Sequence, residues 1–187
     1  MSVQATRLLV LGALRLRQPT HGYDIQRELT SWNADQWANI ARPSVYNQLR
    51  TLSREGHIAV AAVQQDERRP SKTLYSITPS GEAEFTRLLR EIVSNERPQP
   101  LDILPALCFL PMLTKTEISV ALEKRLSIID GFLESFDSHM NSWFHADARA
   151  NYIREIFLLT REAFVGERTW AREFLERIQA DEYQLAQ

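Results

Sequence analysis

One short segment, Arg42 to Gly56, constrains the fold of this chain most, because it predicts a single helix with two chemically different sides. Pro43 suits the first helical turn, where its missing N–H needs no partner, and Gly56 suits the left-handed position just past the end. Three apolar side chains recur at helical spacing and form one stripe: Val45, Leu49 and Leu52. Such a stripe must be buried against other elements, so the helix belongs to a larger packed domain.

The opposite side of this helix is polar and carries side chains that can read nucleic-acid bases. Asn and Arg match the hydrogen-bonding edges of adenine and guanine in the major groove of DNA. A helix that faces only water more typically carries Glu and Lys. We therefore interpret the segment as a recognition helix, with an ordinary solvated surface helix as the alternative. The candidate DNA-contacting residues are Ser44, Tyr46, Asn47, Arg50, Thr51 and Arg54.

A β-hairpin is predicted directly after this helix. Ile58 to Val63 is apolar and contains β-branched residues, Lys72 to Ile77 alternates, and the stretch between them is polar and contains Pro70. Cations at the tip suit a wing that lies along a phosphate backbone. Asp66 and Glu67 would repel phosphate, which leaves three candidate contacts. These are Arg68, Arg69 and Lys72.

Further helices are expected on both sides of these elements. Leu8 to Leu16 is a compact apolar segment, and Thr20 is expected to cap a second helix that runs to Leu29. After the hairpin, Thr78 offers a cap and Pro79 a first-turn residue for another helix. The order helix, helix, helix, hairpin, helix is that of a winged helix-turn-helix domain.

The second half of the chain predicts a helical domain. A capping box, in which Thr114 and Glu117 satisfy each other's amides, opens a long helix with an apolar stripe from Ile118 to Met140. A second long amphipathic helix begins near Asp147, and a short apolar helix is expected before both, over Ala106 to Leu113.

The fold class that follows is mainly α-helical with a small β-hairpin. We predict a winged helix-turn-helix domain over residues 1–93, a linker over residues 94–105 and a helical domain over residues 106–187, because two prolines interrupt the helical pattern between the halves. Residues 1–90 hold 12 Lys and Arg against 8 Asp and Glu, whereas residues 91–187 hold 10 against 16. The basic first half favours contact with nucleic acid there, since binding depends on the local basic surface.

Other function classes lack a positive feature. None of the four histidines forms a metal-binding pair, and the six glycines are too scattered for a phosphate-binding loop, so we expect no enzyme activity, no metal and no cofactor. The single cysteine, Cys108, lies among apolar residues and is expected to be a buried structural thiol. Apolar runs are much shorter than the ~20 residues that span a bilayer, so we expect no membrane association and a cytoplasmic location.

Three ordered motifs resemble the PadR-type transcriptional regulators. They run from His21 to Ile25 (HGYDI), from Pro43 to Leu49 (PSVYNQL) and from Lys72 to Gly81 (KTLYSITPSG). The resemblance covers about the first half of the chain. It implies a homodimeric, ligand-responsive repressor with an N-terminal winged helix and a C-terminal dimerisation region. Two DNA-binding modules held at the spacing of successive major grooves would bind a palindromic double-stranded operator.

The second half therefore carries two further expectations. An apolar stripe persists almost to the C-terminus and is expected to pack against the partner chain, the alternative being packing within its own chain. Aromatic residues there would line an effector pocket for a small hydrophobic or aromatic molecule, although an aromatic stripe also suits a plain core. The dimerisation candidates are Phe164, Trp170, Phe174 and Ile178, and the pocket candidates are Phe109, Phe136, Trp143 and Phe157.

Two functions remain open from the sequence. The first is a dimeric, sequence-specific DNA-binding transcriptional regulator that represses until a ligand binds. The second is a protein-interaction module that uses a winged helix only as a scaffold, since a fold does not fix a function. A salt-dependent affinity for DNA separates the two.

Overall fold

The structure, a computed structural model, describes residues 3–38, 40–66, 69–95, 98–143 and 150–186. Contacts between residues divide the chain into two compact units, residues 1–92 and 93–187. Each unit has buried apolar side chains of its own. The predicted fold class is confirmed, because most described residues are helical and the strands form one small antiparallel sheet. No helix in these ranges is both long enough and apolar enough to cross a bilayer.

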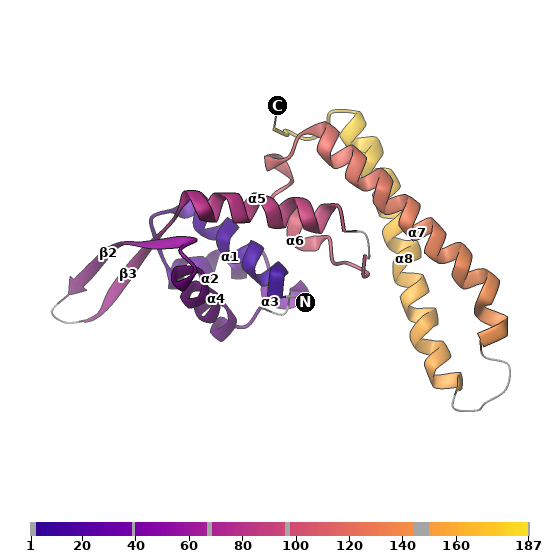
Figure 1. Ribbon diagram of the computed structural model, residues 1–187, viewed down its shortest axis with the longest axis horizontal. Coiled ribbons are helices and arrows are strands. Elements are labelled where there is room, and N and C mark those ends of the chain that lie inside the picture. Colours follow the sequence, from indigo (N-terminus) through magenta and orange to yellow (C-terminus); the bar gives the residue numbers. More distant parts are fainter. Residues whose placement is uncertain (1–2, 39, 67–68, 96–97, 144–149, 187) are drawn as a thin grey trace. The chain divides into compact units, whose positions relative to one another are not determined.

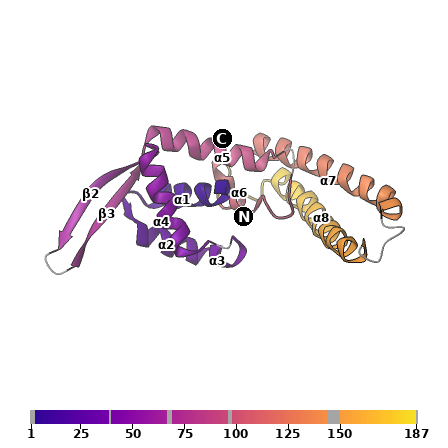
Figure 2. The ribbon, with the colours of Figure 1, turned by 60° about the horizontal axis from the view of Figure 1, so that its bottom comes forward.

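The N-terminal unit places a long hairpin beside a group of helices (Figure 1). In both views strands β2 and β3 extend away from the helices of this unit (Figure 2). The elements, in chain order, are α1 (Val3–Arg17), β1 (Thr20–His21), α2 (Gly22–Ser31), α3 (Ala34–Trp37), α4 (Arg42–Arg54), β2 (Ile58–Asp66), β3 (Arg69–Ile77) and α5 (Pro79–Val93).

Helix α4 is the segment with two chemically different sides, and both of its predicted boundaries are confirmed. Pro43 lies in its first turn, and Gly56 adopts a left-handed conformation with φ of 77° just after the helix ends. Its predicted stripe is also confirmed, since Val45, Leu49 and Leu52 are all buried. They pack in a core to which α1 contributes an almost continuous run of buried side chains.

The sheet has one strand more than the predicted hairpin. Its order is β1-β3-β2, and both pairings are antiparallel. Strands β2 and β3 extend further toward the tip than predicted, and their register shifts between Val60 and Ala62 and again between Gln64 and Asp66. Each shift adds a residue to one strand, which bends and twists the wing locally.

The prediction that Thr20 caps the second helix is wrong. Thr20 is buried in β1 opposite Tyr75 of β3, and the N-cap of α2 is His21, which makes no side-chain capping bond. Instead, Nδ1 of His21 hydrogen-bonds the carbonyl oxygen of Thr73 at 3.2 Å. Pairing with a strand some fifty positions away outweighs the local capping preference of threonine, whose β-branched side chain also suits a strand.

A short helix, α3, lies between α2 and α4. Asn33 starts it in a left-handed conformation with φ of 54°, which asparagine tolerates better than most residues. The indole Nε1 of Trp37 donates to the carbonyl oxygen of Trp32 at 2.9 Å and closes the segment onto itself. Two tryptophans thus stabilise the connection that leads into α4.

The C-terminal unit consists of two short helical turns followed by two long helices that lie side by side (Figures 1 and 2). Its elements are α6 (Leu104–Leu107), η1 (Leu110–Met112), α7 (Lys115–Trp143) and α8 (Ala150–Gln179). The predicted capping box is confirmed, because Oε2 of Glu117 accepts from the Thr114 amide at 2.9 Å and Oγ1 of Thr114 accepts from the Glu117 amide at 3.2 Å. The predicted start of the last helix near Asp147 lies outside the described residues.

A single helix over Ala106 to Leu113 was expected, and this prediction is wrong. The segment forms α6 and η1 instead, because Pro111 has no amide hydrogen to continue a helical ladder. Cys108 lies in the break between them and is exposed, so the prediction of a buried thiol is also wrong.

Helices α7 and α8 are joined by an apolar seam and by buried charge. Ile129, Leu133 and Phe164 form a buried cluster, against which Phe132 packs with its ring 4.8 Å from that of Phe164. One turn earlier on α7, the fully buried Arg125 donates to the equally buried Glu167 of α8 at 2.5 Å and to Asp102 at 2.6 Å. Buried ion pairs rarely add net stability, and this group links α7 both to α8 and to the segment before α6.

Candidate nucleic-acid interface

The outer face of α4 presents three exposed side chains that can contact bases. Asn47, Arg50 and Arg54 are exposed, whereas Ser44, Tyr46 and Thr51 are half-buried on its flanks. Nη2 of Arg50 donates to Oδ1 of Asn47 at 3.1 Å, so the amide and the guanidinium lie side by side. The two groups form a continuous row of donors and acceptors on one side of the helix.

Arg42 is a candidate contact that the sequence interpretation missed. It is exposed in the first turn of α4, and its guanidinium lies 5.8 Å from the centre of the Tyr46 ring. A cation at a helix N-terminus is disfavoured by the helix dipole, which makes its presence informative. That unfavourable position is the sequence signal that would have identified it. DNA phosphate at this end of the helix would compensate for the repulsion.

The wing residues are described only in part. Arg68 lies outside the described residues, whereas the backbones of Arg69 and Lys72 belong to β3 and pair with Asp66 and Gln64 of β2. The side chains of these three predicted phosphate contacts lie outside the described part of the chain. Closer to the helices, β2 exposes two apolar side chains, Val60 and Val63.

Close contact between α2 and α4 fixes the position of the recognition helix. A Cβ atom at Gly22, the first residue of α2, would lie 3.0 Å from Cδ1 of Leu49 and 3.1 Å from Cε1 of Tyr46. A larger residue would require the side chains of Leu49 and Tyr46 to shift by a few tenths of an ångström. The glycine of the HGYDI motif therefore has a packing role at the helix pair that positions the candidate DNA-contacting face.

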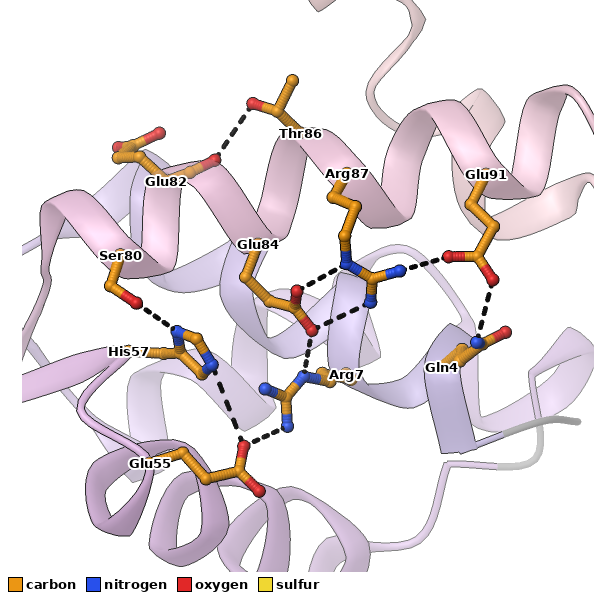
Figure 3. Close-up of polar contacts among 10 residues, drawn as sticks. All are labelled: Gln4, Arg7, Glu55, His57, Ser80, Glu82, Glu84, Thr86, Arg87 and Glu91. Carbon is orange, nitrogen blue, oxygen red and sulfur yellow. Dashed lines mark hydrogen bonds and ion pairs between the residues drawn. The ribbon is translucent and has the colours of Figure 1, made fainter.

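The C-terminal end of α4 is held by a polar network that reaches two other helices (Figure 3). Glu55, the C-cap residue of α4, pairs with Arg7 of α1 at 2.6 Å, and Arg7 also pairs with Glu84 of α5 at 2.8 Å. Arg87 binds the same Glu84 at 2.8 Å and also pairs with Glu91. Figure 3 shows Arg7 between the two carboxylates of Glu55 and Glu84.

Electrostatics of this network favour its charged form. The hydrogen bond from Arg87 and the positive charge of Arg7 hold the pKa of Glu84 below its ordinary value, although partial burial acts in the opposite direction. The hydrogen bond to Glu84 likewise raises the pKa of Arg87. The carboxylate is therefore ionised throughout the neutral range, and both arginines remain paired.

Of the four residues predicted to form an effector pocket, three have described side chains. Phe109 and Phe136 are buried, Phe157 is half-buried with its ring 6.3 Å from that of Phe136, and the side chain of Trp143 lies outside the description. A cavity of about 400 Å³ in the same unit is lined by other residues, including Leu107, Leu110, Trp170, Phe174, Arg177 and Tyr183. The described residues contain no cluster of three metal-ligating side chains.

Three of the four residues predicted to contact a partner chain are buried within their own unit. Phe164, Phe174 and Ile178 are at most 6% exposed, and Trp170 is half-buried with its ring stacked on Phe174 at 5.1 Å. A different face of α8 carries exposed apolar side chains, with Ile156 at 66% and Leu159 at 75% exposure.

The helices α2 and α4, which pack together, and the hairpin of β2 and β3 in a three-stranded sheet define the winged helix-turn-helix class. Residues 10–87, which lie wholly within the N-terminal unit, match the family model described as the transcriptional regulator PadR-like family. Over these residues the N-terminal unit is similar to the PadR-like transcriptional regulators, which agrees with the resemblance seen in the sequence. No curated protein matches the chain.

Several solved structures are similar in fold. Bacillus subtilis PadR in complex with operator DNA is 20% identical, with 92% of this chain and 98% of that chain covered and a TM-score of 0.41. The same protein with p-coumaric acid is 19% identical, with coverage of 94% and 99% and a TM-score of 0.39. The smu.1604c protein from Streptococcus mutans UA159 is 20% identical, with coverage of 91% and 98% and a TM-score of 0.41. Likeness at this level does not transfer the roles of residues.

Proposed function

We propose that this protein is a dimeric, sequence-specific DNA-binding repressor that acts in the cytoplasm and responds to a small ligand. One observation carries the DNA-binding part of the proposal. Helix α4 buries Val45, Leu49 and Leu52 in the core and leaves Asn47 and Arg50 exposed as adjacent, hydrogen-bonded groups. These residue types read adenine and guanine edges. Their position on the outer face of a helix-turn-helix pair suits insertion into the major groove.

Substitution of Arg50 tests base recognition. With an operator fragment selected from bound genomic DNA, Arg50→Ala is expected to lower affinity by about 1–3 kcal/mol while affinity for unrelated DNA changes little. The matched control is Arg154→Ala, which removes an exposed arginine from α8 of the other unit. Fluorescence anisotropy measures the affinities of the wild type and both variants for each of the two DNAs. An equal loss on both DNAs would assign Arg50 to a phosphate contact and contradict base reading.

A protein-interaction module without DNA binding is the second candidate. The observation that favours it is the exposure of Val60 and Val63 on β2, since apolar side chains do not bind phosphate. A wild-type protein whose affinity for duplex DNA does not depend on salt concentration would support this candidate, because phosphate contacts release counterions.

We propose that dimerisation uses the exposed apolar face of α8. Ile156, Leu159, Ala163, Gly166 and Trp170 follow one another at spacings of three and four residues, which places them on one side of the helix. A Cβ atom at Gly166 would meet nothing within 4 Å, so this position leaves room for a partner helix to approach closely. The spacing is that of helices that pack along a common seam.

Introducing a charge into this face tests the dimer. Leu159→Glu is expected to yield a monomer, because burying an unpaired carboxylate between two helices is costly. Arg154→Glu, about 140° around the helix from Leu159, is the matched control and should leave the dimer intact. Light scattering after size exclusion gives the mass of each variant. A dimeric Leu159→Glu protein would contradict the assignment of this face.

We propose that the effector is a small aromatic molecule bound in the 400 Å³ cavity of the C-terminal unit. Trp170 and Phe174 offer stacked rings, and Tyr183 meets Phe174 edge-on at 5.5 Å. The volume falls within the range of ordinary ligand sites. Trp170 belongs both to this cavity and to the proposed dimer face, so a ligand there would favour one dimer geometry over another.

Fluorescence of Trp170 provides the test of this site. Aromatic acids, amides and amines of one or two rings are titrated into the wild type, and each active compound is repeated on Trp170→Phe. Binding at the proposed site gives a signal that this substitution removes, together with a lower affinity for the operator. A compound that releases operator DNA while the Trp170 signal stays unchanged would place the effector elsewhere.

A further inference from the structure

Arg7 connects the end of the recognition helix to two other helices. From α1, its Nη1 lies 2.6 Å from Oε2 of Glu55, the C-cap residue of α4. Its Nε donates to Oε1 of Glu84 on α5 at 2.8 Å. The Arg7 side chain is only 14% exposed, so these charge-assisted bonds lie largely out of water, where they are stronger and more directional than at an open surface (Figure 3).

The turn that follows α4 is also fastened to the start of α5. The Thr78 amide donates to the carbonyl oxygen of His57 at 3.0 Å, and the Thr78 hydroxyl donates to that of Gly56 at 2.7 Å. Nδ1 of His57 and the hydroxyl of Ser80 are hydrogen-bonded at 2.9 Å. These bonds fasten the turn to α5 and none of them reaches α1, to which Arg7 connects the end of α4.

An apolar stripe and an arginine bridge constrain a helix differently. Burial of Val45, Leu49 and Leu52 determines which side of α4 faces the core, but apolar contacts are non-directional. The guanidinium of Arg7, bound to one carboxylate on each side, fixes both a distance and an angle. Recognition of bases demands this accuracy, since contacts fail when the supporting geometry is off by about 0.5 Å or 10–20°.

We propose that Arg7 is a positioning residue for DNA recognition, which sets the angle of α4 in the groove without touching DNA. The inference rests on the proposed DNA-binding function. Arg7 meets α4 at its C-terminal end, whereas helices of this class contact base edges mainly through their N-terminal residues. The Nη1 and Nε groups of Arg7, which phosphate binding would use, are already directed at Glu55 and Glu84.

Arg87 provides a matched control. It also binds Glu84, at 2.8 Å and 3.1 Å, but the contact with Glu55 belongs to Arg7. Arg7→Met and Arg87→Met therefore each remove one positive charge and one ion pair with Glu84, and only the former removes the ion pair with Glu55 at the end of α4. Circular dichroism melts identify a temperature at which both full-length variants and the wild type are folded, and DNA binding is measured there.

The measured quantity is the ratio of affinities for the selected operator fragment and for unrelated DNA at one salt concentration. Arg7→Met should lower this ratio about tenfold, as much as the loss of one base contact, whereas Arg87→Met should leave it within twofold. The slope of log affinity against log salt should stay unchanged in both variants, because no phosphate contact is lost. Glu55→Gln should lower the ratio by a similar factor, and combining it with Arg7→Met should add little more.

Each other outcome has a definite meaning. Equal ratios for Arg7→Met and Arg87→Met, with a wild type that binds the operator, would overturn the positioning role alone. A salt slope smaller by about one in Arg7→Met would show that Arg7 contacts a phosphate, which also overturns it. A wild type without DNA binding would instead remove the proposed function on which the inference rests.

Discussion

Single residues matter most where the backbone of one element touches that of another, and Gly81 of α5 is such a residue. A Cβ atom there would lie 2.0 Å from the carbonyl oxygen of His57 and 2.6 Å from Cγ1 of Ile77. Gly81→Ala should therefore destabilise the protein by at least 1–3 kcal/mol, roughly the cost of overpacking, because backbone cannot move aside cheaply. The control is Gly131→Ala in α7, where nothing lies within 4 Å and a gain of about 0.5–1 kcal/mol is expected. Urea denaturation measures both, and a Gly81→Ala protein as stable as the wild type would contradict the close approach.

A second prediction for a single residue concerns how the stabilising contribution of Glu84 depends on pH. The hydrogen bond from Arg87, followed by the charge of Arg7, lowers its pKa in the folded protein below the ordinary value of 4.5. A carboxyl group of this kind contributes stability above its unfolded pKa and loses that contribution as the pH falls through the folded value. The stability difference between the wild type and Glu84→Gln should thus be constant above pH 4.5 or so and shrink in more acidic buffer. Denaturant midpoints of both proteins across the acid range check this prediction. A stability difference that grows as the pH falls would contradict it.

At the scale of elements, boundaries set by neighbouring residues could be predicted from the sequence, whereas boundaries set by distant partners could not. Pro43 and Gly56 delimit α4 through their own conformational preferences. The position of the buried apolar stripe on α4 then predicted which side of the helix is exposed and could face DNA bases. Strand β1 could not be predicted, because two residues form a strand only when a partner such as β3 is already beside them. The bridge from Arg7 to Glu55 was equally hidden, since it joins residues 48 positions apart.

The contribution of the capping box to the stability of α7 can be tested by removing one hydroxyl group. Thr114→Ala removes the hydroxyl that accepts from the Glu117 amide and should cost about 1 kcal/mol. Thr116→Ala, an exposed threonine of the same first turn, serves as the control and should stay within about 0.5 kcal/mol of the wild type. Thermal unfolding of both variants provides the comparison. Equal losses of stability would mean that the cap contributes no more than any exposed threonine.

At the scale of the whole molecule, the proposed dimer would add what neither unit supplies alone, which is two recognition helices held at a fixed spacing. One DNA-binding module reads few bases, whereas a linked pair gains the effective concentration of the second site. The basic first half and the acidic second half suit this division, since the latter would be repelled by DNA.

The proposed dimer predicts how operator binding depends on the distance between half-sites. Inserting 5 base pairs between the half-sites places them on opposite sides of the duplex and should reduce affinity to that of a single half-site. Inserting about 10 base pairs, one helical turn, returns both half-sites to the same side of the duplex and should restore much of the affinity. Leu159→Glu, as a monomer, should bind all three fragments equally. If the wild type also bound them equally, each subunit would act independently and the α8 face would have no part in recognition. Because both proteins share the same α4 surface, only the coupling between subunits can separate their profiles.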